Sequence, residues 1–199
     1  ALVVTAKAVG EMKVYLSGSV ANRNFTLYID GERISDKLKP AAENGKYVVT
    51  FDVGNYPTVK EIRFIRQQEA DNGTAAILGF DMRGELLETK EKDTLIEFLG
   101  DSITSGMGVH SMNHEDNSTA RTDDGTSAYA FLTAQYLGVN YRIRSRIGIG
   151  VYKNSAGESG VKNGWVDSYN YENCWRDQTT TFSEERKADI VVIYLGTNE

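Results

Sequence analysis

The sequence is poor in cysteine, proline and histidine, and these shortages narrow the classes of protein to consider. A single cysteine, Cys174, among 199 residues allows no internal disulfide and no cysteine-rich zinc site. The two prolines, Pro40 and Pro57, both lie in the first third of the chain. No internal repeat or low-complexity tract is present. We therefore expect ordinary globular domains without a metal-based or disulfide-based scaffold.

Positive charge and long apolar runs are also scarce. Lys and Arg number 22 against 28 Asp and Glu, which gives a net charge of −6 at pH 7. This balance argues against binding to nucleic acid or to an anionic membrane through bulk charge. No apolar run approaches the ~18 residues that cross a bilayer. Hydrophobic residues make up 40% and charged residues 25%, as is typical of folded globular chains.

The first part of the chain, residues 1–90, is predicted to be a β-sandwich of jelly-roll type. Polar and apolar residues alternate with a period of two, and Asp30-Gly31 supplies a turn between two of the segments. The predicted strands are 12–17, 25–29, 46–53, 59–65 and 74–80. At least five strands without a convincing helix favour this architecture.

The pattern changes after the charged stretch 88–92, which is typical of a linker. Strands are predicted at 94–99, 139–147 and 190–195, with helices at 126–137 and 183–187 between them. Apolar strands that alternate with helices indicate a parallel sheet covered by helices. We therefore predict an α/β domain at residues 93–199.

Ser102 directly follows the predicted strand 94–99, in the run LGDSITSG that begins at Leu99. Ligands bind at the carboxyl ends of strands in open α/β sheets. A serine at the start of a helix lies near backbone N–H groups and the positive end of the helix dipole, which can stabilise an oxyanion. Gly100 would let a substrate approach the backbone closely. Alternatively, Asp101 or Ser102 only caps the helix.

Two further strand ends carry groups that can donate hydrogen bonds. Asn198 follows the last predicted strand, in LGTN, and its side-chain amide can donate to a developing oxyanion. Gly148 and Gly150 follow the strand 139–147, where a glycine N–H could do the same. The alternative for each is an ordinary turn. Because the carboxyl ends of parallel strands share one sheet edge, we expect these groups to lie near Ser102.

These motifs resemble the signature blocks of the SGNH, or GDSL-like, hydrolases. GDSITSG looks like their first block, LGTN like their third, and IGIGVYKN like the glycine block between them. The strand-rich first part, including GTAAILGFDMRGELL, is similar to carbohydrate esterase family 2. The resemblance implies a β-sandwich followed by the first part of an SGNH-type α/β hydrolase domain.

The resemblance also implies a function and roles for individual residues. Ser102 is implied as the nucleophile, with Asn198, Gly148 and the Ser102 backbone N–H as oxyanion donors and Gly150 as the alternate. The implied reaction removes acetyl groups from a plant polysaccharide such as xylan or glucomannan through an acyl-enzyme. The implied enzyme is secreted and uses no metal or organic cofactor.

The sequence departs from the family pattern in three places. The family's general base is a histidine in an Asp-x-x-His block, and neither His110 nor His114 follows an aspartate three residues back. Glu199 stands where the family usually has aspartate, and Ile147 precedes Gly148 where a small residue is usual. We expect the histidine to come from a C-terminal continuation or from a second polypeptide.

Other polar and aromatic clusters have less specific interpretations. Trp165 and Trp175 lie in a Gly/Asn-rich stretch and could stack on sugar rings or merely hold a long loop in place. His110 and His114 have a spacing seen in metal sites, but their polar surroundings favour a solvated loop. Cys174 is expected to be a small buried residue.

Three alternating arginines, Arg142, Arg144 and Arg146, are unusual in a buried parallel strand. They could face solvent at a sheet edge or pair with acidic residues. Two other functions are compatible with the sequence as a whole. One is a non-catalytic carbohydrate-binding module, and the other is an SGNH lipase or thioesterase.

Overall fold

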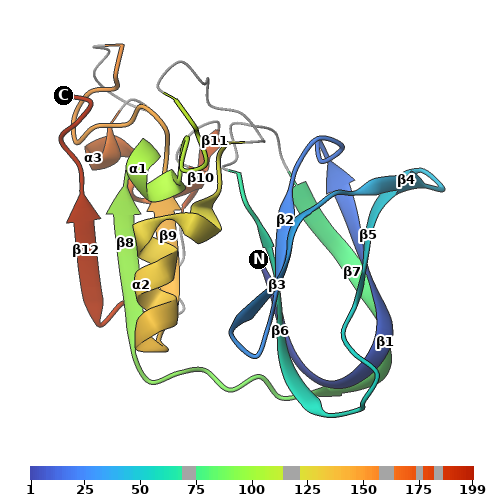
Figure 1. Ribbon diagram of the computed structural model, residues 1–199. Coiled ribbons are helices and arrows are strands. Elements are labelled where there is room, and N and C mark those ends of the chain that lie inside the picture. Colours follow the sequence, from blue (N-terminus) through green and yellow to red (C-terminus); the bar gives the residue numbers. More distant parts are fainter. Residues whose placement is uncertain (69–74, 114–121, 157–163, 174–176, 182–185) are drawn as a thin grey trace. The chain divides into compact units, whose positions relative to one another are not determined.

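The structure is a computed structural model that describes residues 1–68, 75–113, 122–156, 164–173, 177–181 and 186–199. The chain divides into two compact units, Ala1–Glu91 and Lys92–Glu199. The division falls within the charged stretch 88–92. Each unit is described by itself below (Figure 1).

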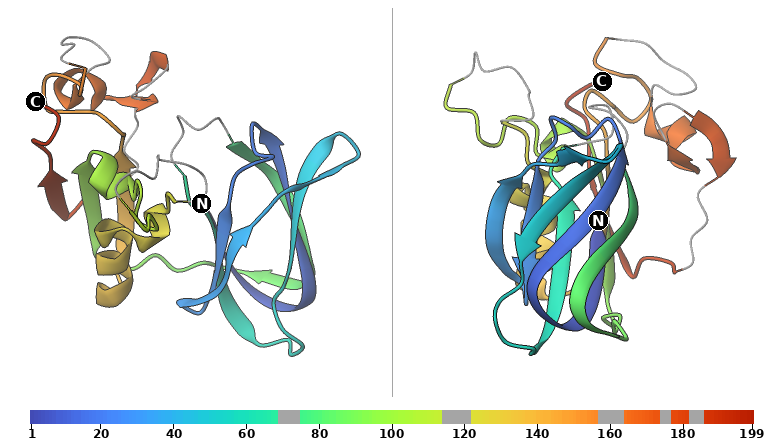
Figure 2. Two further views of the ribbon diagram at one scale, coloured as in Figure 1. Left: turned by 45° about the horizontal axis from the view of Figure 1, so that its top comes forward. Right: turned by 90° about the vertical axis from the view of Figure 1, so that its right-hand side faces the viewer.

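The first unit consists of seven strands in one curled sheet. The strands are β1 (Leu2–Gly18), β2 (Phe25–Ile29), β3 (Glu32–Leu38), β4 (Ala41–Glu43), β5 (Lys46–Asp52), β6 (Val59–Arg66) and β7 (Ala75–Leu87). The sheet order is β3-β2-β6-β1-β5-β4, and β7 also pairs with β1. Every pairing is antiparallel. The strands wrap around a common interior, as Figure 2 shows.

The long strand β1 makes this curl possible because it changes partner in its middle. Residues 2–7 pair with β6, whereas residues 11–16 pair with β5. Gly10 lies at the change with φ +74°, a conformation that glycine adopts without a steric penalty. Its N–H donates to the Gly54 carbonyl at 2.7 Å, and its carbonyl accepts from the Val53 N–H at 2.9 Å.

The interior of the first unit is filled by the inward-facing residues of these strands. Phe64 lies at its centre, stacked on Phe25 with ring centroids 4.6 Å apart and on Phe51 at 5.8 Å. The core residues are Val4, Ala6, Ala8, Met12, Val14, Leu16, Val20, Phe25, Leu27, Val49, Phe51, Val53, Ile62 and Phe64. Their period-two spacing is the signal on which the strand predictions depended.

The second unit contains a small parallel sheet with helices. Its elements are β8 (Leu95–Gly100), α1 (Ser102–Ser105), the 3-10 helix η2 (Gly125–Ser127), α2 (Tyr129–Leu137), β9 (Asn140–Ser145), α3 (Trp165–Ser168), β10 (Tyr171–Asn173), β11 (Asp177–Thr181) and β12 (Ile190–Tyr194). The parallel strands have the order β12-β8-β9. β10 and β11 form a separate antiparallel pair.

The two faces of β8 are covered by different elements. Ile96 and Phe98 pack against Ala130 and Ala134 of α2, which lies over the sheet (Figure 1). Leu99 faces the other way and packs with Ile149 and Trp165. All residues of β8 are buried, so this strand is the centre of the unit.

The α/β fold class predicted from the sequence is confirmed. The strands predicted at 94–99, 139–147 and 190–195 correspond to β8, β9 and β12. The helix predicted at 126–137 is divided into η2 and α2, because Ala128 between them has extended backbone angles.

The sequence did not predict β3 and β4, whose residues are half-buried or exposed and therefore lack a marked apolar alternation. The short α3 and the pair β10 and β11 were also missed. The helix predicted at 183–187 lies mostly outside the described residues.

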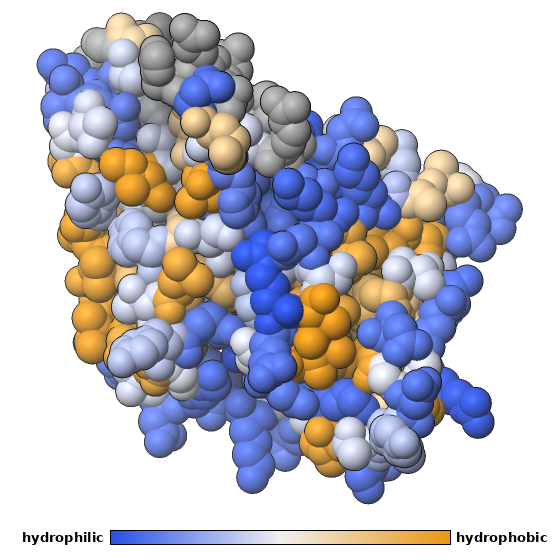
Figure 3. Space-filling view, in the orientation of Figure 1, coloured by the Kyte–Doolittle hydropathy of each residue, from blue (hydrophilic) through white to orange (hydrophobic). Residues whose placement is uncertain are grey.

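β12 is more exposed than its apolar sequence predicts. Among the described strands it pairs only with β8 and is therefore an edge strand. Ile193 is 63% exposed and Ile190 is 49% exposed. Figure 3 shows apolar side chains gathered along the side of the molecule where β12 lies. No helix among the described residues has both the length and the apolar character needed to cross a membrane.

Candidate active site

The carboxyl ends of the three parallel strands are level with one another. Gly100, the last residue of β8, pairs with Tyr194 of β12 on one side and with Ser145 of β9 on the other. The segments that follow these strands therefore emerge at one edge of the sheet, at the top of unit 2 in Figure 1. They contain Ser102, Asn198 and the run IGIGVYKN (residues 147–154, called the glycine loop below), which the sequence predicted to meet there.

Ser102 is the first residue of the four-residue helix α1. Asp101 caps this helix: its Oδ1 accepts a hydrogen bond from the Ile103 N–H at 2.9 Å. Asp101 is fully buried, whereas Ser102 is half-buried. The alternative of a plain cap is thus correct for Asp101, and it leaves the Ser102 hydroxyl uncommitted to capping.

Gly100 is required for packing in this turn rather than for backbone freedom. A Cβ at Gly100 would lie 1.9 Å from Oγ1 of Thr104 and 2.5 Å from its Cβ. Only a residue without a side chain lets α1 lie this close to the end of β8. The close approach places Ser102 directly above the end of the central strand.

Asn198 lies beside the turn that carries Ser102. Its Nδ2 donates to the Ile149 carbonyl at 2.9 Å and approaches Oδ2 of Asp101 at 3.5 Å. One side chain therefore contacts both the turn that carries Ser102 and the glycine loop.

Gly148 and Gly150 differ in the hydrogen bonds that their backbone N–H groups make. The Gly150 N–H already donates to the Lys153 carbonyl at 2.7 Å. Gly148 has φ +77°, and its carbonyl accepts from the Ser155 N–H at 2.7 Å. No hydrogen bond from the Gly148 N–H is found within the described part of the chain.

Glu199 fastens the glycine loop to the segment after β12. Its Oε1 accepts a hydrogen bond from the Val151 N–H. A Cβ at position 150 would lie only 2.7 Å from the same oxygen, so the glycine allows the carboxylate to approach. Glutamate in place of the family's usual aspartate thus still contacts the loop next to Asn198.

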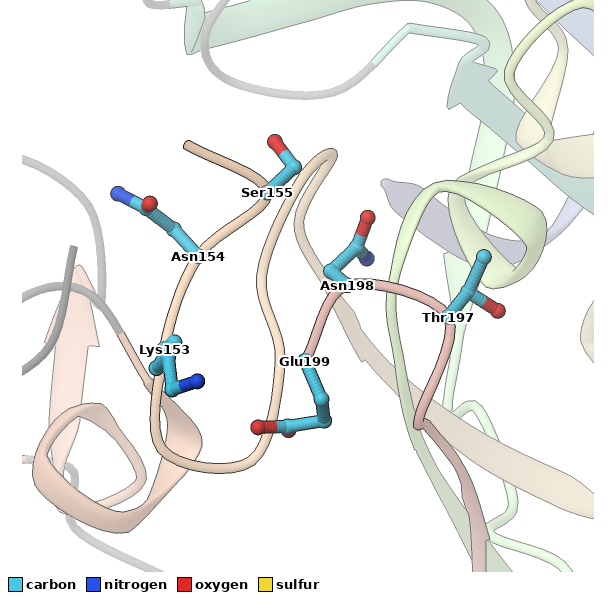
Figure 4. Close-up of a pocket in the computed structure, with 6 residues that line it drawn as sticks. All are labelled: Lys153, Asn154, Ser155, Thr197, Asn198 and Glu199. Carbon is cyan, nitrogen blue, oxygen red and sulfur yellow. The ribbon is translucent and has the colours of Figure 1, made fainter. Parts of the chain in front are cut away.

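A polar pocket of about 210 Å³ lies between the glycine loop and the segment after β12. Figure 4 shows the side chains that line it. They are Lys153, Asn154, Ser155, Thr197, Asn198 and Glu199. Of these lining residues, Asn198 was predicted from the sequence as a site residue and the others were not. The polar residues that follow IGIGVY were the available signal.

Trp165 does not have the open ring expected of a sugar-stacking residue. Its side chain is 3% exposed, and its indole N–H donates to the Gly100 carbonyl at 3.1 Å. The ring packs with Leu99 and Ile149. Burial removes the face on which a sugar would stack, so this interpretation of Trp165 is corrected. Trp175 and Cys174 lie outside the described residues.

His110 contacts residues at the two ends of the 3-10 helix η2. Its Nε2 contacts Oδ2 of Asp124 at 3.1 Å and Oγ of Ser127 at 3.5 Å. A catalytic triad needs its serine and its carboxylate on opposite ring nitrogens of the histidine. Asp124 and Ser127 both contact Nε2, so these residues and His110 do not form a triad. His114 lies outside the described residues, among which no group of three potential metal ligands occurs.

Arg142 and Arg144 of β9 face a buried carboxylate that was not predicted from the sequence. Glu97 of β8 is 1% exposed, and its Oε1 lies 3.9 Å from Nη1 of both Arg142 and Arg144. The Tyr169 hydroxyl donates to its Oε2 at 3.3 Å. Glu97 is the one charged residue in the apolar run TLIEFL. Its presence there was the available signal that a buried acidic group pairs with the arginines.

The chain is similar in sequence to several known proteins. The GDSL-like lipase/acylhydrolase family matches residues 96–199. An acetylxylan esterase/glucomannan deacetylase of Cellvibrio japonicus is 28% identical over 196 residues, which cover 94% of this chain and 54% of that protein. The cellulase/esterase CelE of Acetivibrio thermocellus is 33% identical over 136 residues, or 67% of this chain and 16% of that protein.

The solved structures agree with the fold of both units. A family two carbohydrate esterase from Clostridium thermocellum in complex with cellohexaose has a TM-score of 0.82 at 26% identity, covering 98% of this chain and 58% of that one. An acetyl xylan esterase from Butyrivibrio proteoclasticus has a TM-score of 0.83 at 22% identity, covering 98% of this chain and 55% of that one. The chain thus spans little more than half of these relatives. It belongs to the GDSL-like lipase/acylhydrolase family.

Proposed function

We propose that this chain carries the nucleophile and the oxyanion donors of a secreted serine esterase. The proposed reaction removes O-acetyl groups from a plant cell-wall polysaccharide, xylan or glucomannan. One observation carries the proposal: Asn198 contacts both the turn that holds Ser102 and the loop that holds Gly148. The names of the relatives support the acetylated polysaccharide as substrate.

In the proposed mechanism, Ser102 Oγ attacks the acetyl carbonyl carbon and gives its proton to a general base. The carbonyl oxygen becomes an oxyanion, which accepts hydrogen bonds from Asn198 Nδ2, the Gly148 N–H and the Ser102 N–H. When the tetrahedral intermediate collapses, the bond between the carbonyl carbon and the sugar oxygen breaks. The sugar oxygen leaves and receives from the base the proton that came from Ser102. Water then attacks acetyl-Ser102 and releases acetate.

The general base is a requirement of this mechanism. In the resembled family it is a histidine, and His110 is held in the cap of η2 by Asp124. We propose that the general base is a residue other than those described at this site. No step calls for a metal ion or an organic cofactor.

The decisive experiment measures acetate release from acetylated xylan and acetylated glucomannan by the full-length protein. Ser102→Ala should lower the rate by several orders of magnitude, because the acyl-enzyme cannot form. Ser105→Ala is the matched control: Ser105 lies in the same helix, and its Oγ donates to Ser145 Oγ at 3.0 Å rather than facing the substrate position. Undiminished acetate release by Ser102→Ala would refute the proposal.

A series of p-nitrophenyl esters distinguishes the proposal from its rivals. An acetyl esterase should lose activity steeply as the acyl chain grows beyond acetyl, whereas a lipase or thioesterase should gain activity. A binding module should retain xylan binding in both serine variants and hydrolyse none of the esters.

A further inference from the structure

Trp165 makes two hydrogen bonds that join separate parts of the candidate site. Its side chain reaches the end of β8, where the indole Nε1–H donates to the Gly100 carbonyl at 3.1 Å. Its backbone N–H donates to the Gly150 carbonyl at 3.1 Å. One buried residue is therefore bonded on one side to the turn before Ser102 and on the other to the glycine loop.

The backbone contact with the glycine loop continues on both sides of Trp165. Gly164 forms a parallel bridge with Gly150, and the Val166 N–H donates to the Val151 carbonyl at 3.1 Å. A Cβ at Gly164 would lie 2.6 Å from the Val151 oxygen. The start of α3 is thus pressed against the loop that presents the Gly148 N–H.

Packing around the indole ring brings in the third segment of the site. The ring packs with Leu99 and Ile149. Ile149 in turn supplies the carbonyl that accepts from Asn198 Nδ2 at 2.9 Å. The nucleophile turn, the glycine loop and Asn198 are all connected through the residues around this ring.

A guanidinium group holds the ring from the side of the sheet. The Arg144 Cζ lies 5.5 Å from the Trp165 ring centroid and 4.7 Å from that of Tyr169, distances at which cations attract aromatic faces. Arg144 Nη2 also donates to the Tyr169 carbonyl at 2.6 Å. Because Arg144 belongs to β9, this contact anchors the ring to the sheet.

We infer that Trp165 is a positioning residue for the oxyanion site. It fixes the Ser102 turn and the Gly148 N–H at the separation that the tetrahedral intermediate requires. This inference rests on the proposed esterase function. A displacement of about 1 Å at such a site can lower the rate on the order of 100-fold, because the donors act only at a defined distance.

The test is Trp165→Phe in the full-length protein. Phenylalanine keeps an aromatic ring and the backbone hydrogen bond to Gly150, and it removes the N–H that bonds to Gly100 together with part of the ring volume. We expect kcat for p-nitrophenyl acetate to fall about tenfold while KM stays within about twofold, because ground-state binding does not use the oxyanion donors. Affinity for a boronic acid, which forms a tetrahedral adduct with serine, should fall by the same factor.

Thr26→Val is the matched control for the loss of one buried hydrogen bond. Thr26 Oγ1 accepts from Gln67 Nε2 at 2.7 Å in the first unit, and both residues are buried. Its kcat and boronic acid affinity should equal those of the wild type, even if its melting temperature falls as far as that of Trp165→Phe. If Trp165→Phe does not fold, benzothienylalanine at position 165 replaces the N–H by sulfur at nearly equal volume.

Ser102→Ala in the same series separates the two hypotheses. If Ser102→Ala is inactive and the position-165 variants keep wild-type kcat and boronic acid affinity, Trp165 has no positioning role, and the proposed function is unaffected. If Ser102→Ala keeps its activity, the proposed function itself is wrong. If kcat falls in the position-165 variants at constant KM, the inference is supported.

Discussion

Asn198 is bound to Ile149 across the carboxyl edge of the sheet, with Nδ2 2.9 Å from the carbonyl oxygen. A side-chain amide has two N–H hydrogens, and the Ile149 carbonyl takes one of them. The other can reach Oδ2 of Asp101 at 3.5 Å, which is long for a hydrogen bond. In the proposed mechanism, this second hydrogen is the one that Asn198 donates to the oxyanion.

The first prediction concerns this second hydrogen. Asn198→Ala in the full-length protein should lower kcat for acetyl esters by roughly 100- to 1,000-fold, the usual cost of removing one oxyanion donor. Asn140→Ala is the matched control, because Asn140 Nδ2 also donates to a backbone carbonyl, that of Lys92, at the opposite end of the same sheet. Steady-state kinetics on both variants would test the role, and equal rates for the two would contradict it.

A second prediction concerns the cap of α1. Asp101→Ala removes the oxygen that accepts from the Ile103 N–H, and the loss of such a cap costs about 1 kcal/mol of unfolding free energy. Asp101→Asn keeps an acceptor oxygen and should retain most of that stability. Urea unfolding of the three proteins measures the difference. Equal destabilisation by alanine and asparagine would show that the charge, and not the cap, is what matters.

A third prediction concerns the buried Glu97. Glu97→Gln keeps the side-chain shape but leaves the guanidinium groups of Arg142 and Arg144 without the carboxylate that lies between them. We expect a loss of about 3 kcal/mol, since breaking a buried ion pair leaves uncompensated charge. Glu61→Gln is the comparison: Glu61 pairs with Arg63 at 2.7 Å and is less buried, so its loss should cost less than about 1 kcal/mol. A cost for Glu97→Gln no greater than that for Glu61→Gln would contradict the ranking.

The sequence predicted the ends of β8, β9 and β12 well because strand ends are marked by strong local signals. An apolar strand followed by Gly100-Asp101-Ser102, or by Gly196-Thr197-Asn198, places polar groups at the same edge of any parallel sheet. The distance between Asn198 and Ile149 could not be predicted in the same way, because it depends on the fold of the glycine loop.

Burial was harder to predict than secondary structure. Trp165 stands in a Gly/Asn-rich stretch without periodicity, so nothing local indicates that its ring is covered. The covering residues, Leu99 and Ile149, come from other segments. The arginines of β9 were recognised as unusual, but their partner Glu97 is set by the parallel register of β8 and β9, which no local pattern specifies.

The last prediction concerns the start of β12 and its dependence on pH. Asp189 Oδ2 accepts from the Leu95 N–H at 2.8 Å and from Arg186 Nη2 at 3.2 Å. The Leu95 N–H, followed by the charge of Arg186, lowers the pKa of Asp189 below its ordinary value, although partial desolvation opposes this. A lowered pKa in the folded state means that the carboxylate stabilises the fold above its unfolded-state pKa of about 4.

This stabilisation is lost as the pH falls through the lower, folded-state pKa. Asp189→Asn should therefore unfold at a lower urea concentration than the wild type at about pH 7, and the gap should close below about pH 4. Urea midpoints at several pH values measure the gap, with Glu88→Gln as an exposed control that should follow the wild type. Because protonation makes Asp189 resemble the amide, a gap that stays constant into acid would show that its charge does not stabilise the junction of β8 and β12.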